Sequence, residues 1–272
     1  MEKAKLPVNT TNCNLILLIL MAIFGSPGPA HAQFPVLDES DKRWLGEQIF
    51  QAECAGRRDC LTAWNAGEEF PSLGIGHFIW IPRGQESRYE QTFPALVEHI
   101  LATGRQAPTW LQQQRRAGAP WQSREQFLAQ FDDPRMQELR NWLYDTRHLQ
   151  VEFILARFEQ RIGDMRAQGI LDETASKRLH HIALSEPPSG LYALVDYSHF
   201  KGMGTAVSER YRGEGWGLLQ VLESMDDSGP ALTAFVEAAA ATLQRRVRNA
   251  PVERNEQRWI KGWLNRVEGY LP

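Results

Sequence analysis

The chain has 272 residues, a formal net charge of −3 at pH 7 and only three cysteines, a length that can bury a sizeable core in one large domain or two small ones. The slight acidic excess argues against a dedicated nucleic-acid binder, and three cysteines are too few for a disulfide scaffold. Charged residues (23%) and aromatic residues (10%) occur at ordinary globular frequencies, which argues against a largely disordered chain.

The N-terminal residues 1–32 have the three parts of a secretory signal. Two lysines precede the apolar run 15–24, and residues 30–32 show the A-x-A pattern that signal peptidase accepts. This run is too short to span a bilayer, which takes about 20 apolar residues. We therefore expect a signal peptide over 1–32, a mature chain that begins at Gln33, a secreted or periplasmic location, and no membrane anchor after cleavage.

Removal of the signal leaves two cysteines, Cys54 and Cys60, in an oxidising compartment. Their spacing is too wide for C-x-x-C chemistry, and no further Cys or His set accompanies them, so a disulfide is favoured over two free thiols or a metal pair. The bridge closes a short loop and should stabilise the fold by about 2 kcal/mol. The mature chain is also one unit more negative than the full chain, because the signal carries two lysines and one glutamate.

The first expected element of the mature chain is a helix over 41–53, whose apolar residues recur at helical spacing. A short β-type run at 61–65 and a longer extended run at 68–81 follow, separated by an Ala-Gly turn, which predicts a small hairpin. The second run contains a proline and two glycines, so it should be a bent strand or an edge strand.

The remainder of the chain has helical patterns and no repeated strand–helix units. A short helix is expected at 94–102, and the Gly-, Gln-, Pro- and Arg-rich segment 103–120 is expected to be an irregular connection. Ser123 is a predicted helix cap, and Asp133 followed by proline opens a longer helix. Further helices are predicted at 172–184, 189–199, 214–225, 230–248 and 251–271.

The segment from Glu53 to Trp80 holds the residues with chemical potential. A glutamate ends a helix, a hairpin follows, and its second strand closes on Gly-Ile-Gly-His at 74–77. This arrangement resembles the lysozyme superfamily, most closely the phage-type lysozymes, whose motif is a helix-terminal Glu, a hairpin with an acid and a hydroxyl residue, and then Gly-Ile-Gly-His. Residues 193–196 and 249–254 resemble, more weakly, the helix on the far wall of the family's cleft and its final helices.

The resemblance implies an α+β, mainly helical, lysozyme-like fold with a small β-hairpin lobe and a larger helical lobe. We assign residues 33–272 to this domain, with the hairpin lobe and an insertion at 83–130 inside 33–130, and the helical lobe at 131–272. No metal and no organic cofactor is implied.

The activity that the resemblance implies is hydrolysis of β-1,4 bonds in an amino-sugar polymer, with peptidoglycan as the first substrate. Chitosan, a polycation, stays open as an alternative because the chain is acidic and murein is itself anionic. A non-catalytic lysozyme-like module that binds a wall glycan or inhibits a partner is the third possibility. A nucleic-acid partner is not expected.

Glu53 is the candidate general acid. Glycoside hydrolysis needs a carboxylic acid that stays protonated near neutral pH, and partial burial beside Ile49 and Phe50 would raise the pKa of such a group. The alternative is a plain helix-end glutamate, exposed and without a role.

The second carboxylate is less well defined, because the family's hairpin aspartate falls on Ala66. In an extended strand Glu68 and Ser72 share one face, while Glu69 points away. We therefore predict Glu68 as the water-activating base or charge stabiliser and Ser72 as the hydroxyl that positions water. A solvated turn residue is the alternative for Glu68.

The remaining candidates are predicted to hold the site or bind substrate. His77 should bridge the hairpin and the helix and orient Glu53. Asp196 and His199 lie three residues apart on one helical face, which by resemblance faces the cleft together with Tyr197, so they would hold sugar hydroxyls or N-acetyl groups. Arg254 matches a family arginine near the site.

Overall fold

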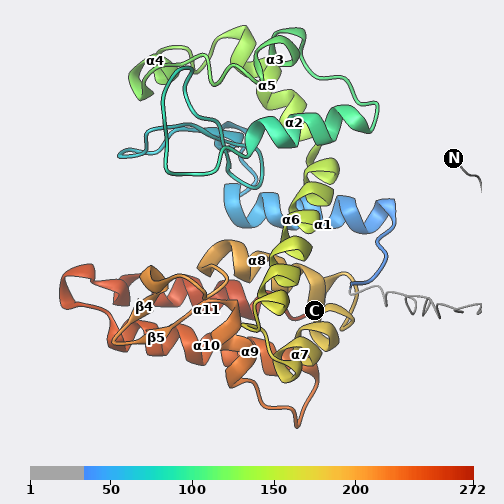
Figure 1. The fold of residues 1–272 in the computed structure, drawn as a ribbon, viewed down its shortest axis with the longest axis vertical. Helices are drawn as coiled ribbons and strands as arrows, with labels where there is room; N and C mark the ends of the chain where they lie inside the picture. Colours follow the sequence, from blue (N-terminus) through green and yellow to red (C-terminus); the bar gives the residue numbers. More distant parts are fainter. Residues whose placement is uncertain (1–33) are drawn as a thin grey trace, which may run out of the picture. The chain divides into compact units, whose positions relative to one another are not determined.

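A computed structural model describes residues 34–272, and the predicted signal peptide lies outside the described residues. The first helix, α1 (Glu39–Cys54), confirms the predicted one and is capped by Asp38, whose carboxylate accepts hydrogen bonds from the backbone of the first turn. Its apolar face is buried, and the helix crosses α6 (Arg147–Ala167) and packs against it in the middle of the fold (Figure 1).

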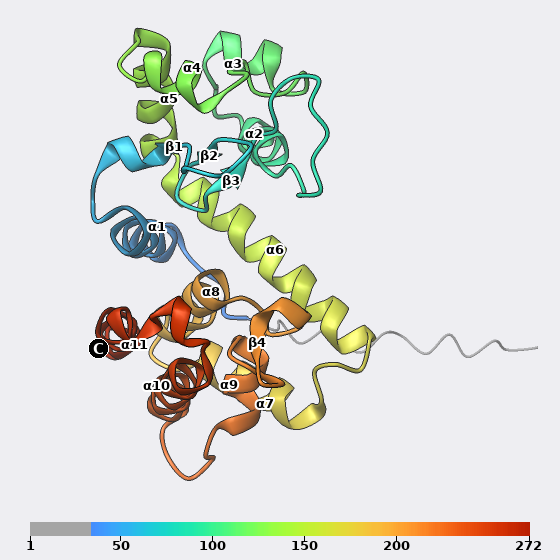
Figure 2. The ribbon, with the colours of Figure 1, turned by 90° about the vertical axis from the view of Figure 1, so that its left-hand side faces the viewer.

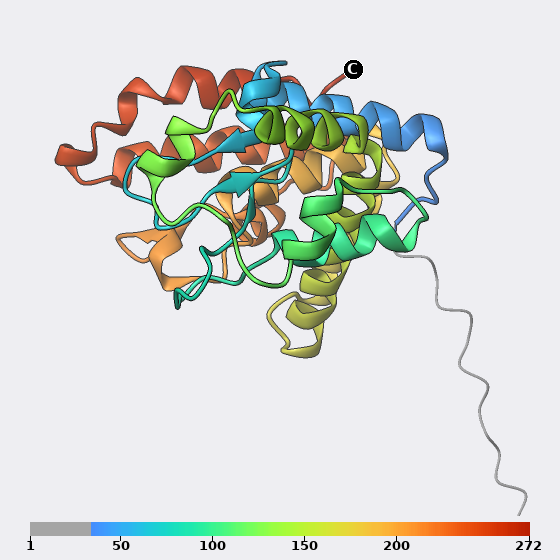
Figure 3. The ribbon, with the colours of Figure 1, turned by 90° about the horizontal axis from the view of Figure 1, so that it is seen from above.

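A three-stranded antiparallel sheet follows α1, with the strands in the order β1-β2-β3. Figure 2 labels these strands, and Figure 3 shows the same part of the fold from above. The strands are β1 (Thr62–Ala63), β2 (Ser72–Leu73) and β3 (Phe78–Ile79). The predicted second strand is therefore two short strands, because the Gly-Ile-Gly-His residues form a tight turn between them instead of ending a strand. This turn reverses the chain and brings its last residue back toward the end of α1.

The small lobe is completed by four helices, α2 (Phe93–Ala102), α3 (Thr109–Gln114), α4 (Arg124–Ala129) and α5 (Pro134–Asp145). Three of them are where the sequence predicts them, and Ser123 caps α4 as expected. The segment predicted as an irregular connection contains α3, whose single turn and a half is too short to give a clear apolar period.

The boundary between the lobes differs from the expected one. Helix α5 packs against β1, where Arg140 donates a hydrogen bond to Thr62 over 2.7 Å, so α5 belongs with the sheet and not with the helical lobe that was expected to begin at 131. The long helix α6 then leads from the small lobe to the helical one (Figure 2).

The helical lobe consists of α7 (Glu173–Ala183), α8 (Ser189–Lys201), α9 (Leu218–Ser224), α10 (Ala231–Asn249) and α11 (Ile260–Glu268). A two-stranded hairpin, β4 (Arg210–Tyr211) with β5 (Glu214–Gly215), takes the start of the helix predicted at 214–225.

The helix predicted at 251–271 is shorter than expected. Two 3₁₀ turns, Val252–Arg254 and Glu256–Arg258, precede it around Asn255, which has a left-handed backbone. The fold as a whole is mainly helical with small antiparallel sheets, which confirms the mainly helical α+β part of the predicted fold class. Among the helices of residues 34–272, none has both the length and the apolar character needed to cross a bilayer.

Candidate active site

Glu53 lies one residue before the end of α1, where its side chain is only 15% exposed. One carboxylate oxygen, Oε1, accepts a hydrogen bond from Nη2 of Arg266 in α11 at 2.5 Å. The other, Oε2, lies 3.4 Å from Nε2 of His77. The predicted contact between His77 and Glu53 is therefore present, and an arginine that the sequence did not single out completes it.

The predicted disulfide is confirmed. Cys54 and Cys60 are bonded, and they connect the end of α1 to the 3₁₀ turn Arg58–Leu61. Ala55 between them has a left-handed backbone (φ +50°), which reverses the chain directly after Glu53. The bridge thus restrains the helix terminus that carries the candidate acid.

Asp196 has a structural position and not the predicted substrate-facing one. Its side chain is 1% exposed, and its carboxylate accepts two hydrogen bonds from Arg266, at 2.7 and 2.9 Å, and one from the Tyr270 hydroxyl at 2.6 Å. A sugar has no access to it. Asp196 instead holds the guanidinium that contacts Glu53.

Two further predicted substrate contacts are corrected by the structure. Tyr197 is fully buried in the helical lobe, where its hydroxyl donates a hydrogen bond to the Trp216 carbonyl. Arg254 is exposed in a 3₁₀ turn, and it makes no hydrogen bond or ion pair with Glu53 or Asp196 within the described chain.

Arg266 could have been found from the pattern of the last helix. It shares the apolar stripe with Trp263 and Tyr270 at helical spacing. A guanidinium on an inward stripe requires a buried acid, because an unpaired buried charge is strongly unfavourable. The sequence does not say which acid this is.

Gln150 of α6 fixes the turn that carries His77. This fully buried amide accepts a hydrogen bond from the Ile75 backbone at 2.9 Å and donates to the Leu143 carbonyl at 2.6 Å. Gly74 permits the contact, since it has a φ of +73° and a Cβ there would lie 2.5 Å from the Gln150 Oε1. The turn is thus docked on α6 with His77 next to Glu53.

The electrostatics of Glu53 differ from the expectation of a raised pKa. Burial does push the pKa of Glu53 up, but the hydrogen bond from His77 and the charge of Arg266 outweigh burial. The balance lowers the pKa of Glu53 from 4.5 to about 2. In this arrangement the carboxyl group is ionised at neutral pH.

A groove of about 900 Å³ lies on the outer side of His77, and Glu68, Glu69, Ser72 and Glu86 also line it. Both Glu68 and Glu69 reach the groove, because the chain before β2 consists of turns and does not alternate like a strand. The prediction that Glu69 points away is therefore wrong.

Glu68 and Ser72 are placed differently along this groove. One carboxylate oxygen of Glu68, Oε1, accepts a hydrogen bond from Asn65 at 3.2 Å, whereas its buried Oε2 has no partner among the described residues. Ser72 is 5% exposed in β2, where it lies opposite Ile79 in the sheet. Both predicted residues therefore line one groove with His77.

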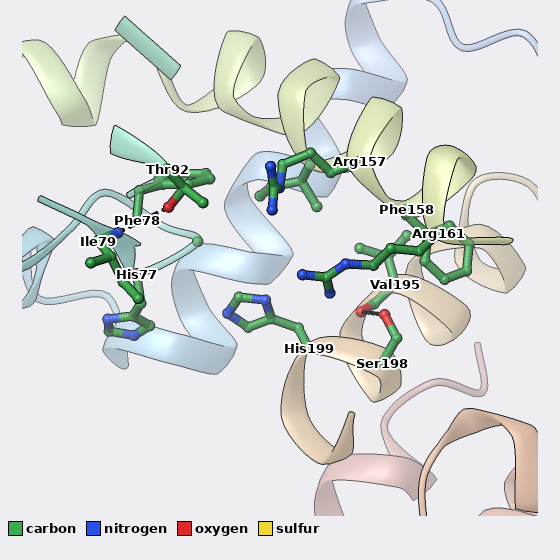
Figure 4. A pocket seen from close by; sticks show the side chains of 12 residues that line it. His77, Phe78, Ile79, Thr92, Arg157, Phe158, Arg161, Val195, Ser198 and His199 are labelled. Carbon is green, nitrogen blue, oxygen red and sulfur yellow. Dashed lines mark hydrogen bonds between the residues drawn. The ribbon is translucent and has the colours of Figure 1, made fainter. Parts of the chain in front are cut away.

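A second cavity of about 200 Å³ lies on the other side of His77, between the sheet, α6 and α8 (Figure 4). His199 lines it together with Arg157, Arg161 and Ser198. The protein atoms around His199 lower the pKa of its imidazole by desolvation, against the opposite effect of Glu53. His199 therefore lies at the site, as predicted, while its neighbours Asp196 and Tyr197 do not face the cavity.

A third, very small cavity of about 10 Å³ lies directly beside Glu53, and His199 and Gly76 line both this cavity and the second one.

Comparisons of the chain with protein-family models, with curated proteins and with solved structures found no match. The assignment of this site thus depends on its own geometry and charge.

Proposed function

We propose that the protein is a glycoside hydrolase with a lysozyme-like fold that cleaves β-1,4 bonds of an amino-sugar polymer, with peptidoglycan as its substrate. The observation that carries the proposal is the position of Glu53. It lies near the end of α1 and contacts His77, and His77 lines a groove that contains a second carboxylate. Glycosidases use such a pair of carboxyl groups, one as acid and one as base or nucleophile.

The low pKa of Glu53 requires a change when substrate binds, because a general acid must carry a proton. His77 supplies the largest of the interactions that lower this pKa, and its side chain is 30% exposed toward the groove. A sugar that turns His77 away would remove that hydrogen bond and exclude water from Glu53. Both effects raise the pKa of Glu53 and favour its protonated form.

Glu68 is the second carboxylate in this proposal. Its Oε2 lacks a hydrogen-bond partner among the described residues, which leaves an acceptor for the proton of an attacking water. Ser72 lines the same groove and can hold that water.

A non-catalytic glycan-binding module is the second candidate. The observation in its favour is the pKa of about 2, which leaves Glu53 almost wholly ionised while it contacts Arg266 and His77. In that case Glu53 would stabilise the end of α1 and the groove would only bind glycan.

Chitosan remains the alternative substrate of a hydrolase. Three glutamates, Glu68, Glu69 and Glu86, line the groove with one arginine, Arg88, and such a surface suits a polycation.

The test is the release of reducing ends from purified peptidoglycan and from chitosan by the unaltered protein, Glu53→Gln and Glu47→Gln. Glu47 lies on the same helix, and its side chain is 42% exposed, so its variant controls for the loss of one negative charge from α1. We expect Glu53→Gln to reduce release by about 100-fold or more and Glu47→Gln to leave it unchanged. Equal rates for all three proteins, or binding with no release, would exclude the hydrolase and favour the binding module.

A further inference from the structure

The second cavity is lined by two arginines, Arg157 and Arg161, to which the proposed hydrolysis assigns no role. We infer that it is a subsite for a carboxylate on the glycan, namely the lactyl group of a muramic acid or the acidic peptide attached to it. The inference rests on the proposed function, since it names the substituent that the same site would recognise.

The lining of this cavity carries cationic and donor groups without acidic ones. Two guanidiniums, from Arg157 and Arg161, project into it from α6, and His199 reaches it from α8 (Figure 4). No Asp or Glu is present among the residues that line it in the described part of the chain. Guanidinium groups match the geometry of a carboxylate, to which they can donate two parallel hydrogen bonds.

Arg161 is the cation of the pair that has no direct partner among the described residues. Arg157 forms a two-point ion pair with Glu90, at 2.7 and 2.8 Å, whereas Arg161 makes no ion pair or hydrogen bond within residues 34–272. Desolvation, and then the like charge of Arg157, lower the pKa of Arg161, against the smaller opposite effects of Glu90 and Glu209. A carboxylate in the cavity would give this guanidinium a direct ion pair, which neither glutamate supplies.

The location of the cavity connects it to the bond that Glu53 would cleave. Four of its lining residues also line the small cavity beside Glu53: Gly76, Ile154, Val195 and His199. A substituent held by Arg161 would therefore belong to a sugar at or next to the reacting linkage. Chitin carries no carboxylate and chitosan carries ammonium groups, so neither would gain from this subsite.

The experiment measures dissociation constants for three tetrasaccharides in a Glu53→Gln background, which prevents cleavage. The ligands are a muramic-acid tetrasaccharide that carries its peptides, the same glycan without peptides, and neutral chitotetraose. We expect the peptide-bearing ligand to bind more tightly than chitotetraose, and Arg161→Gln to weaken its binding by about tenfold, the loss expected for one charge-assisted hydrogen bond. Arg105→Gln removes one exposed positive charge elsewhere and should leave this preference in place.

The source of the carboxylate follows from the peptide-free ligand. If this ligand keeps the preference, the lactyl group occupies the subsite, and if it loses the preference, the peptide does. The inference is overturned if chitotetraose binds as tightly as both anionic ligands, or if Arg161→Gln weakens all three equally or none. Because the measurement is binding, a protein that releases no reducing ends but keeps the preference would lose the hydrolase proposal and retain the subsite.

Discussion

Glu53 is subject to two opposing effects, and their balance decides its protonation state. Burial at the end of α1 disfavours the carboxylate, while His77 and Arg266 stabilise it. Of these two partners, His77 has the more exposed side chain, at 30% against 19% for Arg266. Arg266 is in addition held by its ion pair with Asp196. The contact with His77 is therefore the one that a ligand in the groove can change most easily.

The substitution His77→Asn tests this balance at a single residue. Asparagine tolerates the left-handed backbone found at His77 (φ +47°) but lacks a cationic form. We expect the pKa of Glu53 to rise from about 2 toward 4.5, as measured by NMR titration of ¹³C-labelled glutamate. The matched control is His181→Asn on the exposed side of α7, which should leave this pKa unchanged.

His77→Asn should also change how much stability the protein loses when the pH is lowered. The pKa of Glu53 is lowered in the folded state, so its interactions stabilise the fold above pH 4.5, and that contribution is lost as the pH falls toward 2. In His77→Asn the loss over this range should be smaller than in the unaltered protein. An equal loss in both proteins would mean that His77 does not hold Glu53 in its ionised form.

At the scale of elements, the sequence predicts features that depend on neighbouring residues better than features that depend on long-range contacts. The end of α1, the disulfide and the helix caps follow from residues that are close in sequence, and each is found where expected. The short sheet is only partly predicted, because Gly-Ile-Gly-His has the composition of a bent strand as well as of a turn. Its choice of a turn depends on Gln150, 75 positions away from Ile75.

In the candidate site too, the residues of one short segment are predicted from the sequence, whereas the contacts from distant helices are not. Glu53, Glu68, Ser72 and His77 belong to one short segment. The last three line the groove, and Glu53 contacts His77. The contacts from the helical lobe could not be assigned in advance, because helical periodicity identifies a face but not the partner that covers it. The sequence therefore predicts a substrate contact at Asp196, whose carboxylate instead pairs with Arg266, and it does not single out Arg266.

The disulfide is the element-scale feature with a measurable contribution. Replacement of both cysteines, Cys54→Ala together with Cys60→Ala, should lower the free energy of unfolding by about 2 kcal/mol, as expected for a loop this short. Alanine is preferred to serine because Cys54 is buried, at 3% exposure. Urea unfolding with and without a thiol reductant checks this. The reductant should shift the midpoint of the unaltered protein and not that of the variant, and equal midpoints throughout would contradict the prediction.

At the scale of the whole molecule, one guanidinium connects helices from distant parts of the chain. Arg266 joins α11 to Asp196 in α8, 70 positions away, and to Glu53 in α1, 213 positions away. Both carboxylates are largely buried, so each depends on this countercharge. Helix α11 therefore contributes to the geometry of a site whose other groups come from α1, the sheet, α6 and α8.

Arg266→Met keeps the length of the side chain and removes its charge. We expect the free energy of unfolding to fall by about 3–5 kcal/mol, the effect of leaving a buried charge unpaired. Arg245→Met, which breaks a more exposed ion pair with Glu214, should cost less than about 1 kcal/mol. Chemical denaturation of both variants compares these effects, and equal losses would show that the Arg266 contacts do not hold the helices together.

His77 lies between two surfaces of opposite charge, and this arrangement gives the site a polarity. Carboxylates dominate the groove on one side, and guanidiniums line the cavity on the other. Under the proposed function, peptidoglycan would carry a carboxylate on every second sugar, and a strand shifted by one sugar across His77 would move this carboxylate from the guanidiniums toward the glutamates. Under that proposal the charges would select one register of the strand, so that Glu53 would meet the same one of the two alternating linkages each time.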